Sequence, residues 1–439
     1  MTKVVKFGGS SLASAEQFRK VKEIITAEES RRFVVPSAPG KRFSADTKVT
    51  DMLYGCYDLA VKGKDFDKEF EAIKARYNEI ISELGLDLSL ESEFEIVKAC
   101  FIGKAGRDYA ASRGEYLNGI VLANYLGYSF IDSADVIFFD EKGQFDPVKT
   151  GRVLSERLAG LENAVVPGFY GSMPNDTIKT FSRGGSDITG SIVAAASNAD
   201  LYENWTDVSG FLTCDPRIVD DPAPITTITY KELRELSYMG ATVLHEDAIF
   251  PVRKAGIPIN IKNTNKPEDP GTLIVESTSQ KPAYTITGIA GKKGFTAINI
   301  EKDMMNSELG FGRKVLWEFE KNGVSFEHMP SGIDTMSIVV SQDAFADKEQ
   351  EILAGIHRNC QPDSIDIETD LALIAVVGRA MKSNRGTAGR IFSALAHAHV
   401  NVKMIDQGSS ELNIIIGVSE SDFEAANKAI YDIFVATKL

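Results

Sequence analysis

Up to about residue 280, short runs of β-branched and aromatic residues alternate with longer stretches whose apolar positions recur at a helical period. Lys3–Phe7 is the first short run, and the helix predicted at 14–27 places Phe18, Val21 and Ile24 on one side. Strand and helix in alternation predict an α/β domain with a mainly parallel sheet. Residues 48–126 are predicted to be nearly all helical, with another helix at 187–198 and further strands at 33–35, 130–131, 136–139, 164–167, 201–205, 258–261 and 272–275.

A polar segment rich in turn-forming residues, 263–271, marks a boundary together with 277–282, and the pattern changes after it. The next elements are predicted in the order βαββαβ, which is typical of a ferredoxin-like domain, at 295–300, 312–321, 324–328, 336–340, 346–358 and 364–368.

The same order begins again at 373 and stops before its last strand, with elements predicted at 373–377, 387–398, 400–405, 413–418 and 422–434. An apolar alternation at 284–289 is the obvious source of the missing strand, so we expect the first repeat to be inserted within the second. The predicted domains are therefore 1–280, 294–369, and 283–293 joined to 370–439.

Composition narrows the class of protein. Among 439 residues, 48 are Lys or Arg and 62 are Asp or Glu, so the formal charge is −14. A chain this acidic lacks the positive surface that binds nucleic acid or an anionic membrane. No apolar run approaches the roughly 20 residues that span a bilayer, and the N-terminus lacks the apolar core of a signal peptide. The four cysteines are scattered without CxxC spacing, as in a cytoplasmic protein with reduced thiols.

The segment Lys6–Ser11 (KFGGSS) carries the first unusual chemistry. Paired glycines at the end of a strand let backbone N–H groups approach an anion, and Lys6 can add a point charge to a phosphate. A simple turn with a solvated lysine explains this motif about equally well. The chain has neither a Walker loop nor a complete GxGxxG motif, so a nucleotide would have to bind in another manner.

Two further segments are candidates for anion or nucleotide binding. Phe181–Asp187 (FSRGGSD) leads into a helix, and although a capped helix explains Ser186 and Asp187, it does not explain Arg183 beside paired glycines. Trp205–Arg217 (WTDVSGFLTCDPR) could hold the base, ribose and phosphate of a nucleotide, or be an ordinary loop. Ser112–Glu115 is a weaker candidate, because a helical glutamate is usually a solvated carboxylate.

Taken together and in this order, these segments closely resemble the aspartate kinases, and the resemblance covers essentially the whole chain. It implies an α/β fold: an amino acid kinase-like sandwich with a mainly parallel sheet, followed by two ferredoxin-like βαββαβ domains of the ACT type. It also implies transfer of the γ-phosphoryl group of ATP, with Mg²⁺ on the phosphates, to the β-carboxylate of L-aspartate. A carboxylate is already ionised at pH 7, so no general base is needed.

The resemblance also implies residue roles. Lys6, Asp187 and Arg183 would be catalytic, with Lys6 balancing the charge of the transferred group and Arg183 binding a carboxylate of aspartate. The other residues expected to bind aspartate are Ser37, Thr50, Glu115, Phe169 and Ser186. Those expected to bind ATP, together with Lys6, are Gly8, Gly9, Ser10, Thr206, Asp207, Phe211 and Arg217.

Regulation and assembly are the last expectations. Effectors of ACT domains usually bind between the loop after the first strand and the second strand of a neighbouring domain. Acidic groups there suit an ammonium, so we expect lysine rather than threonine as the allosteric effector, and a homodimer or homotetramer formed through the ACT domains. The expected effector residues are Met305, Phe311, Gly312, Phe326, Glu327, Ser331 and Asp334.

One departure from the family pattern and two rival interpretations remain. Many relatives have a lysine that reaches the nucleotide where this chain has Thr242, so contacts on that side are open. Nothing downstream suggests a fused dehydrogenase. A kinase of the same fold could act on glutamate or N-acetylglutamate, and a catalytically dead amino-acid sensor is the other alternative. The presence of Lys6, Arg183 and Asp187 argues against the sensor.

Overall fold

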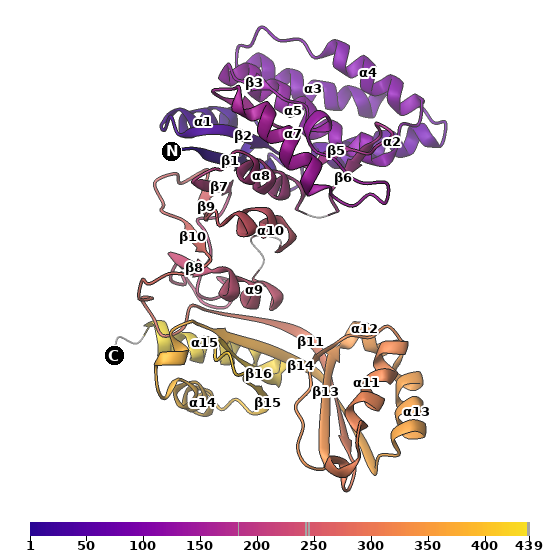
Figure 1. The fold of residues 1–439 in the computed structure, drawn as a ribbon, viewed down its shortest axis with the longest axis vertical. Coiled ribbons are helices and arrows are strands. Elements are labelled where there is room, and N and C mark those ends of the chain that lie inside the picture. The colour runs from indigo at the N-terminus through magenta and orange to yellow at the C-terminus, as the bar shows by residue number, and fades with distance from the viewer. Residues whose placement is uncertain (183, 242–243, 245, 437–439) are drawn as a thin grey trace. The chain divides into compact units, whose positions relative to one another are not determined.

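The computed structural model describes residues 1–182, 184–241, 244 and 246–436 (Figure 1). The chain forms two compact units. Unit 1 consists of Met1–Phe211, Thr226–Tyr230 and Val243–Thr278, and unit 2 of Leu212–Ile225, Lys231–Thr242 and Ser279–Leu439. The domain bounds given above stay predictions, and the units group the segments 212–225 and 231–242 with the ACT-like repeats.

Unit 1 is built on an eight-stranded sheet in the order β3-β4-β2-β1-β7-β9-β10-β8. All neighbouring strands are parallel except β9 and β10. Its strands are β1 (Lys3–Phe7), β2 (Arg31–Pro36), β3 (Ser129–Phe130), β4 (Ala164–Val165), β7 (Leu201–Thr206), β8 (Thr227–Thr229), β9 (Ile259–Asn263) and β10 (Thr272–Val275).

The centre of this sheet positions the candidate site. Phe7, the last residue of β1, is level with Pro36 of β2 and Trp205 of β7. Because the three strands are parallel, the residues that follow them leave the sheet at the same edge. The segments that begin at Gly8, Ser37 and Thr206 therefore start side by side.

Helices cover both faces of this sheet. Val5 and Phe7 of β1 belong to the same hydrophobic core as residues of five helices. Alternation along the strand turns Val4 and Lys6 to the other face, where α8 (Gly185–Ala196) lies, with α10 (Glu246–Ala255) beside it (Figure 1). The five helices are α1 (Ala15–Thr26), α2 (Val49–Val61), α3 (Asp67–Glu83), α4 (Glu91–Ile102) and α5 (Arg107–Leu126).

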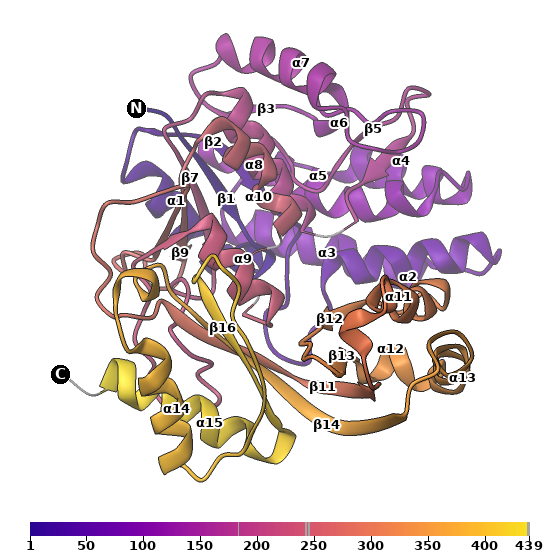
Figure 2. The same ribbon diagram turned by 60° about the horizontal axis from the view of Figure 1, so that its bottom comes forward.

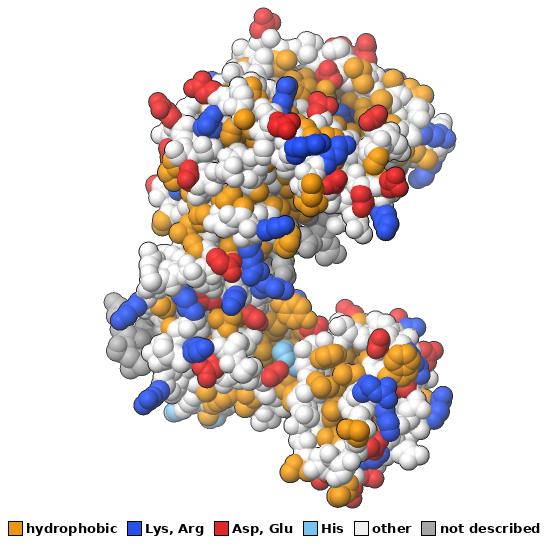
Figure 3. All heavy atoms as spheres, in the orientation of Figure 1, with side chains coloured by type: hydrophobic (Ala, Val, Ile, Leu, Met, Phe, Trp, Pro, Cys, Tyr) orange, Lys and Arg blue, Asp and Glu red, His pale blue; other side chains and the backbone are white. Residues whose placement is uncertain are grey.

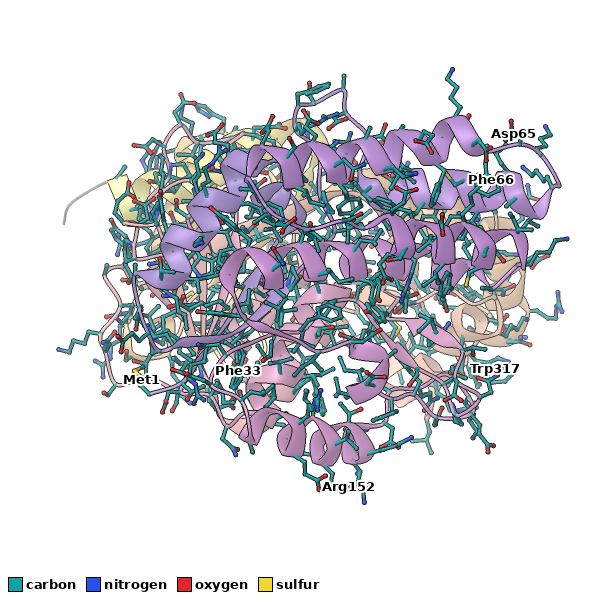
Figure 4. The ribbon with its side chains drawn as sticks, turned by 90° about the horizontal axis from the view of Figure 1, so that it is seen from above. Met1, Phe33, Asp65, Phe66, Arg152 and Trp317 are labelled. Atoms are coloured by element: carbon teal, nitrogen blue, oxygen red, sulfur yellow. The ribbon has the colours of Figure 1, made fainter. Side chains whose placement is uncertain are left out.

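The long helical segment predicted at 48–126 is thus four helices. Figure 4 looks onto them, with Asp65 and Phe66 in the turn between α2 and α3. Phe66, Phe70 and Phe101 pack edge to face or tilted, with ring centroids 6.1–6.2 Å apart. Aromatic side chains therefore hold the layer together.

The predicted strand at 136–139 is wrong. Residues Ser133–Val136 form the short helix α6, and Phe138 and Phe139 make only isolated bridges, to Ser172 and Phe145. An apolar run is ambiguous between a buried strand and a buried turn, and here Asp132 caps a helix by accepting a hydrogen bond from the Ala134 N–H, at 2.9 Å. Elements that the sequence did not reveal include α7 (Pro147–Ala159), the hairpin of β5 (Tyr170–Ser172) and β6 (Ile178–Thr180), β8, α10 and the helix at Tyr230–Tyr238.

Unit 2 contains a six-stranded antiparallel sheet in the order β12-β13-β11-β14-β16-β15. Two 14-residue strands, β11 (Gly288–Glu301) and β14 (Ser364–Val377), run through both repeats (Figure 2). The other strands are β12 (Phe326–His328), β13 (Thr335–Ser341), β15 (Val402–Asp406) and β16 (Asn413–Ser419), and the helices are α9 (Tyr230–Tyr238, which begins in unit 1), α11 (Phe311–Lys321), α12 (Gln342–Ala346), α13 (Glu349–Cys360), α14 (Thr387–His397) and α15 (Phe423–Tyr431).

The first half of β11 completes the second repeat. Residues 288–293 pair with 372–377 of β14, whereas 295–301 pair with β13 and with 364–368, 371. A bulge beside Gly294, where φ is +88°, divides the strand into these halves. The completing strand therefore comes from upstream of the first repeat, as the sequence predicts, although it begins a few residues later than 284. Each repeat has its own hydrophobic core.

The surface carries charged side chains of both signs, as the composition indicates. On the face drawn in Figure 3, Lys and Arg side chains are interspersed with Asp and Glu. None of the helices in the part of the chain that the structure describes has both the length and the apolar composition needed to cross a bilayer.

Candidate active site

A cleft of about 600 Å³ opens where β1, β2 and β7 end. It brings together eight of the residues predicted to bind substrates, from four segments that are far apart in the sequence. These are Gly8, Gly9, Ser10, Ser37, Thr50, Glu115, Thr206 and Asp207; the remaining lining residues are Ala38, Pro39, Gly40, Lys41, Phe43, Ser44 and Lys48.

Lys6 and Asp187 form a buried ion pair beside this cleft. The Lys6 ammonium lies 2.6 Å from Oδ1 of Asp187 and 3.4 Å from Oδ1 of Asn204. The Asn204 amide donates to the same Asp187 oxygen at 2.9 Å. Three elements, β1, β7 and the first turn of α8, thus hold one cation in place, and a preorganised cation is what a reaction that moves phosphate charge requires.

The turn after β1 is packed too tightly for side chains. A Cβ on Gly9 would lie 2.9 Å from the carbonyl oxygen of Ala38, and one on Gly40 would lie 2.5 Å from the carbonyl carbon of Gly9. The Gly8 N–H donates to the Trp205 carbonyl at 3.0 Å. It is therefore already used in this arrangement, which corrects the expectation that it donates to a phosphate; Gly8 leaves room for the ligand and for the Lys6 ammonium.

Glu115 is the buried acid of the cleft. It comes from α5, and burial raises the pKa of its carboxyl to about 8, although a hydrogen bond from the Ala38 N–H and the charges of Arg113 and Lys6 lower it. Its Oε2 is buried without a hydrogen-bond partner among the described residues. A buried acceptor that lacks a donor is a site for a cationic or N–H-bearing ligand.

A strained backbone marks the segment before the glycine-rich helix start. Phe169 has a φ of +83°, which is rare for an aromatic residue, and its N–H donates to the Thr189 hydroxyl at 3.0 Å. A Cβ on Gly185 would lie 2.2 Å from the Phe169 ring. The second glycine of the predicted GGSD nest is therefore needed for packing against Phe169, and Ser186 lies beside Gly168 in the same way.

Two of the residues predicted to bind ATP do not line this cleft. The Phe211 side chain is buried, and its N–H donates to the Thr272 hydroxyl at 2.8 Å. Arg217 belongs to unit 2, is exposed, and pairs with Asp215 at 2.5 Å. Arg183 and Thr242 lie outside the described residues.

Sequence reasoning missed the segment that follows β2. Ser37 was expected to bind substrate, but Gly40, Lys41, Ser44 and Lys48 line the same cleft. The only signal was a run of turn-forming residues followed by several charged ones, which usually indicates a solvated loop.

The expected effector residues fall into two groups. The Met305 and Phe311 side chains belong to the core of the first repeat, so their part in effector binding stays a prediction for their main-chain groups. Asp334 accepts a hydrogen bond from the Met304 N–H at 3.0 Å, and Glu327 accepts one from the Tyr238 hydroxyl. Phe326, Ser331 and Asp334 are exposed.

A second hollow in unit 1 is larger and mostly apolar. It measures about 770 Å³, lies between α7, α8 and α10, and is lined by Phe145, Phe181 and Phe250 among others. An apolar wall cannot neutralise phosphates, so we place the chemistry in the smaller, polar cleft. Within the described chain, no three His, Cys, Asp or Glu side chains are grouped as metal ligands.

Comparison with known proteins supplies the class. Residues 1–263 match the family described as "Amino acid kinase family", and residues 374–434 match "ACT domain". The chain is 41% identical to Aspartokinase 3 of Bacillus subtilis over 99% of both chains. Its fold is similar to the crystal structure of Clostridium acetobutylicum aspartate kinase, with a TM-score of 0.94, 56% identity, and coverage of 98% and 100% of the two chains. Escherichia coli aspartokinase III in complex with lysine and aspartate shares the fold at 23% identity, with a TM-score of 0.71 and coverage of 98% and 99%.

These matches define an amino acid kinase with ACT domains. Within that class, the chain belongs to the aspartokinases, which transfer the γ-phosphoryl group of ATP to the β-carboxylate of L-aspartate in amino-acid biosynthesis. Identity to aspartokinases over the full chain favours aspartate over the glutamate-type acceptors and the inactive sensor that the sequence left open.

The raised pKa of Glu115 predicts a pH-dependent stability. Its pKa is about 8 in the folded protein and 4.5 for an ordinary glutamate, so the folded state holds an extra proton between these values. The contribution of the Glu115 carboxyl to the free energy of unfolding is fully present below about pH 4.5 and is lost as the pH rises through 8. We expect Glu115→Gln to match the wild type at pH 5 and to exceed its free energy of unfolding by about 2–4 kcal/mol at pH 8.5, measured by urea unfolding.

Glu95→Gln, which neutralises an exposed carboxylate on α4, is the control and should leave the difference between the two pH values unchanged. If the difference in free energy of unfolding between Glu115→Gln and the wild type is the same at pH 5 and pH 8.5, Glu115 is not protonated in the folded protein.

Proposed function

We propose that the polar cleft is where aspartokinase chemistry takes place in this chain, with the phosphates of ATP on the Gly8–Ser10 turn. The observation that carries this proposal is the Lys6–Asp187–Asn204 group, which places a fixed ammonium at the turn. Thr206 and Asp207, which leave the neighbouring strand at the same edge, would hold the rest of the nucleotide. Phe211 and Arg217 keep their predicted part in ATP binding only as a proposal.

Aspartate would bind at the side of the cleft that Glu115 forms. The partnerless Oε2 of Glu115 suits the α-ammonium of the substrate, and that cation would pull the carboxyl into its ionised form. Ser37 and Thr50 line the same cleft. Arg183, Ser186 and Phe169 are proposed to hold the carboxylates, with the strained Phe169 backbone fixing the floor of the pocket.

The reaction requires positioning rather than proton transfer. A β-carboxylate oxygen of aspartate attacks the γ-phosphorus in line; the new O–P bond forms as the bond to the β–γ bridging oxygen breaks, and ADP leaves with that electron pair. Lys6 balances the charge of the transferred group, and Asp187 and Asn204 hold its ammonium. Mg²⁺ bound with ATP would be held chiefly by phosphate oxygens, where it supplies further neutralising charge.

The Lys6 ammonium is expected to be essential for turnover. Lys6→Ala should lower kcat by about 10²-fold or more because it removes a preorganised charge from the transition state, whereas Arg183→Ala should mainly raise the KM for aspartate. The measurement is ATP-dependent formation of aspartyl hydroxamate, with glutamate as the alternative acceptor. Lys20→Ala, which removes a half-exposed lysine that pairs with Glu16, is the control. Near-normal turnover by Lys6→Ala would refute the assignment.

Regulation is proposed to act through lysine at the first ACT-like repeat. The acidic Glu327 and Asp334 suit an ammonium, and the E. coli enzyme with the same fold was solved with bound lysine. Because Glu327 accepts a hydrogen bond from Tyr238 of α9, a bound ammonium would compete with that contact. Inhibition requires that lysine bind one arrangement better than another, and a coupling of about 1–3 kcal/mol is typical.

Lysine at millimolar concentration is therefore expected to inhibit the kinase, and Glu327→Ala to weaken that inhibition about tenfold or more. The measurement is the rate against lysine concentration, with Glu320→Ala, an exposed acid on α11, as the control. If threonine inhibits and lysine does not, the effector is wrong; if Glu327→Ala is inhibited like the wild type, the site is misplaced.

Assembly and location complete the proposal. The open edge strands of the ACT-like sheet, β12 and β15, favour pairing with a second copy, so we expect a homodimer or a dimer of dimers by light scattering at micromolar concentration. A monomer would contradict it. A cytoplasmic location is proposed because the four cysteines are scattered without CxxC spacing and none forms a disulfide among the described residues.

A further inference from the structure

The segment from Ser37 to Lys48, here called the 37–48 loop, supplies more than half of the residues that line the cleft. It joins the end of β2 to the start of α2. It faces the Gly8–Ser10 turn, and the Gly40 N–H donates to the Gly9 carbonyl at 2.8 Å. The loop therefore packs directly against the Gly8–Ser10 turn and forms the adjoining wall of the cleft.

This wall carries two cations that have no carboxylate partner. Lys41 and Lys48 both line the cleft and are exposed, and neither forms an ion pair with any described residue. Lys41 bonds only to the Ser44 carbonyl, at 3.3 Å. The acidic residues of the cleft are Glu115 and Asp207. Unpaired ammonium groups facing a phosphate turn fit a polyphosphate, which carries several negative charges.

A buried arginine holds the loop in this position. The Arg76 side chain, from α3, is only 3% exposed, and it donates to the carbonyls of Gly40 at 2.7 Å and Ala13 at 3.1 Å. It also forms an ion pair with Asp46 at 2.8 Å. One guanidinium thus ties the middle of the loop, its distal part and the segment before α1 together.

Asp46 is locked into this arrangement from the other side as well. Arg42 donates to it from both its main-chain N–H and its Nε, each at 2.9 Å, and also contacts Glu79 at 3.0 Å. Hydrogen bonds from Arg42 hold the pKa of the Asp46 carboxyl well below its usual range. Two arginines on one ionised carboxylate fix the conformation of this loop, which an ordinary solvated surface loop does not require.

We propose that Lys41 and Lys48 bind the phosphates of ATP, and that Arg76 is a positioning residue that holds the 37–48 loop against the phosphate turn. This inference rests on the proposed placement of ATP on the Gly8–Ser10 turn. It adds to that placement a second set of cations, supplied from the adjoining loop and independent of Lys6.

The first test is the KM for MgATP of Lys41→Met and Lys48→Met. Each substitution should raise this KM about five- to tenfold, and the double variant about 50-fold, while the KM for aspartate stays within twofold, because a solvent-exposed cation contributes modestly to each phosphate contact. The dependence of the KM for MgATP on ionic strength should become shallower in the double variant. Lys62→Met removes a lysine at the far end of α2, outside the cleft, and should change neither value.

The second test is a double-mutant cycle on Arg76. Arg76→Met should raise the KM for MgATP as the double lysine variant does, and adding Lys41→Met and Lys48→Met to it should cause little further loss, because the displaced loop no longer presents them. Arg76→Lys should recover part of the affinity. Arg32→Met is the control, because Arg32 also donates to two carbonyls, those of Glu162 and Leu161, but away from the cleft. If Arg76→Met does not fold, Asp46→Asn tests the same anchor from the loop side.

The outcomes distinguish a failure of this inference from a failure of the proposed active site. Loss of turnover in Lys6→Ala together with an unchanged KM for MgATP in the double lysine variant would overturn this inference and leave the proposed site intact. Normal turnover in Lys6→Ala would overturn the proposed site itself. Fully additive effects of Arg76→Met and the lysine substitutions would show that Arg76 does not position these lysines.

Discussion

The ion pair between Lys6 and Asp187 is the contact on which the rest of the catalytic unit depends. It joins the central strand β1 to the first turn of α8, and Asn204 extends it to β7. A buried ammonium is stable only with such partners, so the same contacts that keep the charge in the protein also fix its position. Catalysis by charge neutralisation needs that fixed position, because a cation already in place has no reorganisation to undergo during phosphoryl transfer.

Beside this ion pair, the cleft has a region that carries cations and a region that carries a buried acid. The walls at Gly8–Ser10 and the 37–48 loop have little side-chain bulk near the turn and carry cations. Next to the loop lies Glu115, a buried acid with a raised pKa that accepts a hydrogen bond from the Ala38 N–H and whose Oε2 has no partner among the described residues. An anion with several charges suits the first region and an ammonium the second. The proposed places of ATP and aspartate within the cleft are therefore distinct.

Much of the fold follows from local patterns, because strand alternation and helical periodicity are properties of short segments. Residues 3–7 and 272–275 were predicted as strands with the bounds of β1 and β10. The strand that completes the second repeat was predicted because that repeat stops before its last strand. The failure at 136–139 arose where an apolar run is compatible with two structures. The bulge at Gly294, which lets one strand serve two repeats, was also invisible to a periodicity argument.

Motifs in the sequence pointed to part of the site: the structure places Gly8, Gly9 and Ser10 of KFGGSS in the cleft, and Asp187 of FSRGGSD beside Lys6. Lys41, Lys48 and Arg76 could not be found in this way, because exposed lysines and a helical arginine are ordinary residues. Their significance depends on which surfaces long-range packing brings together. Phe211 shows the reverse case: it lies in a motif that resembles the family, yet its side chain is buried away from the cleft.

The most direct test of the central claim is a crystal structure of the complete chain with ADP, Mg²⁺ and L-aspartate. The account predicts the diphosphate on the Gly8–Ser10 turn, with the Lys6 ammonium within hydrogen-bond distance of a phosphate oxygen, and the α-ammonium of aspartate on Glu115. A diphosphate bound elsewhere, for example in the apolar hollow beside Phe250, with Lys6 still paired only to Asp187 and Asn204, would contradict it.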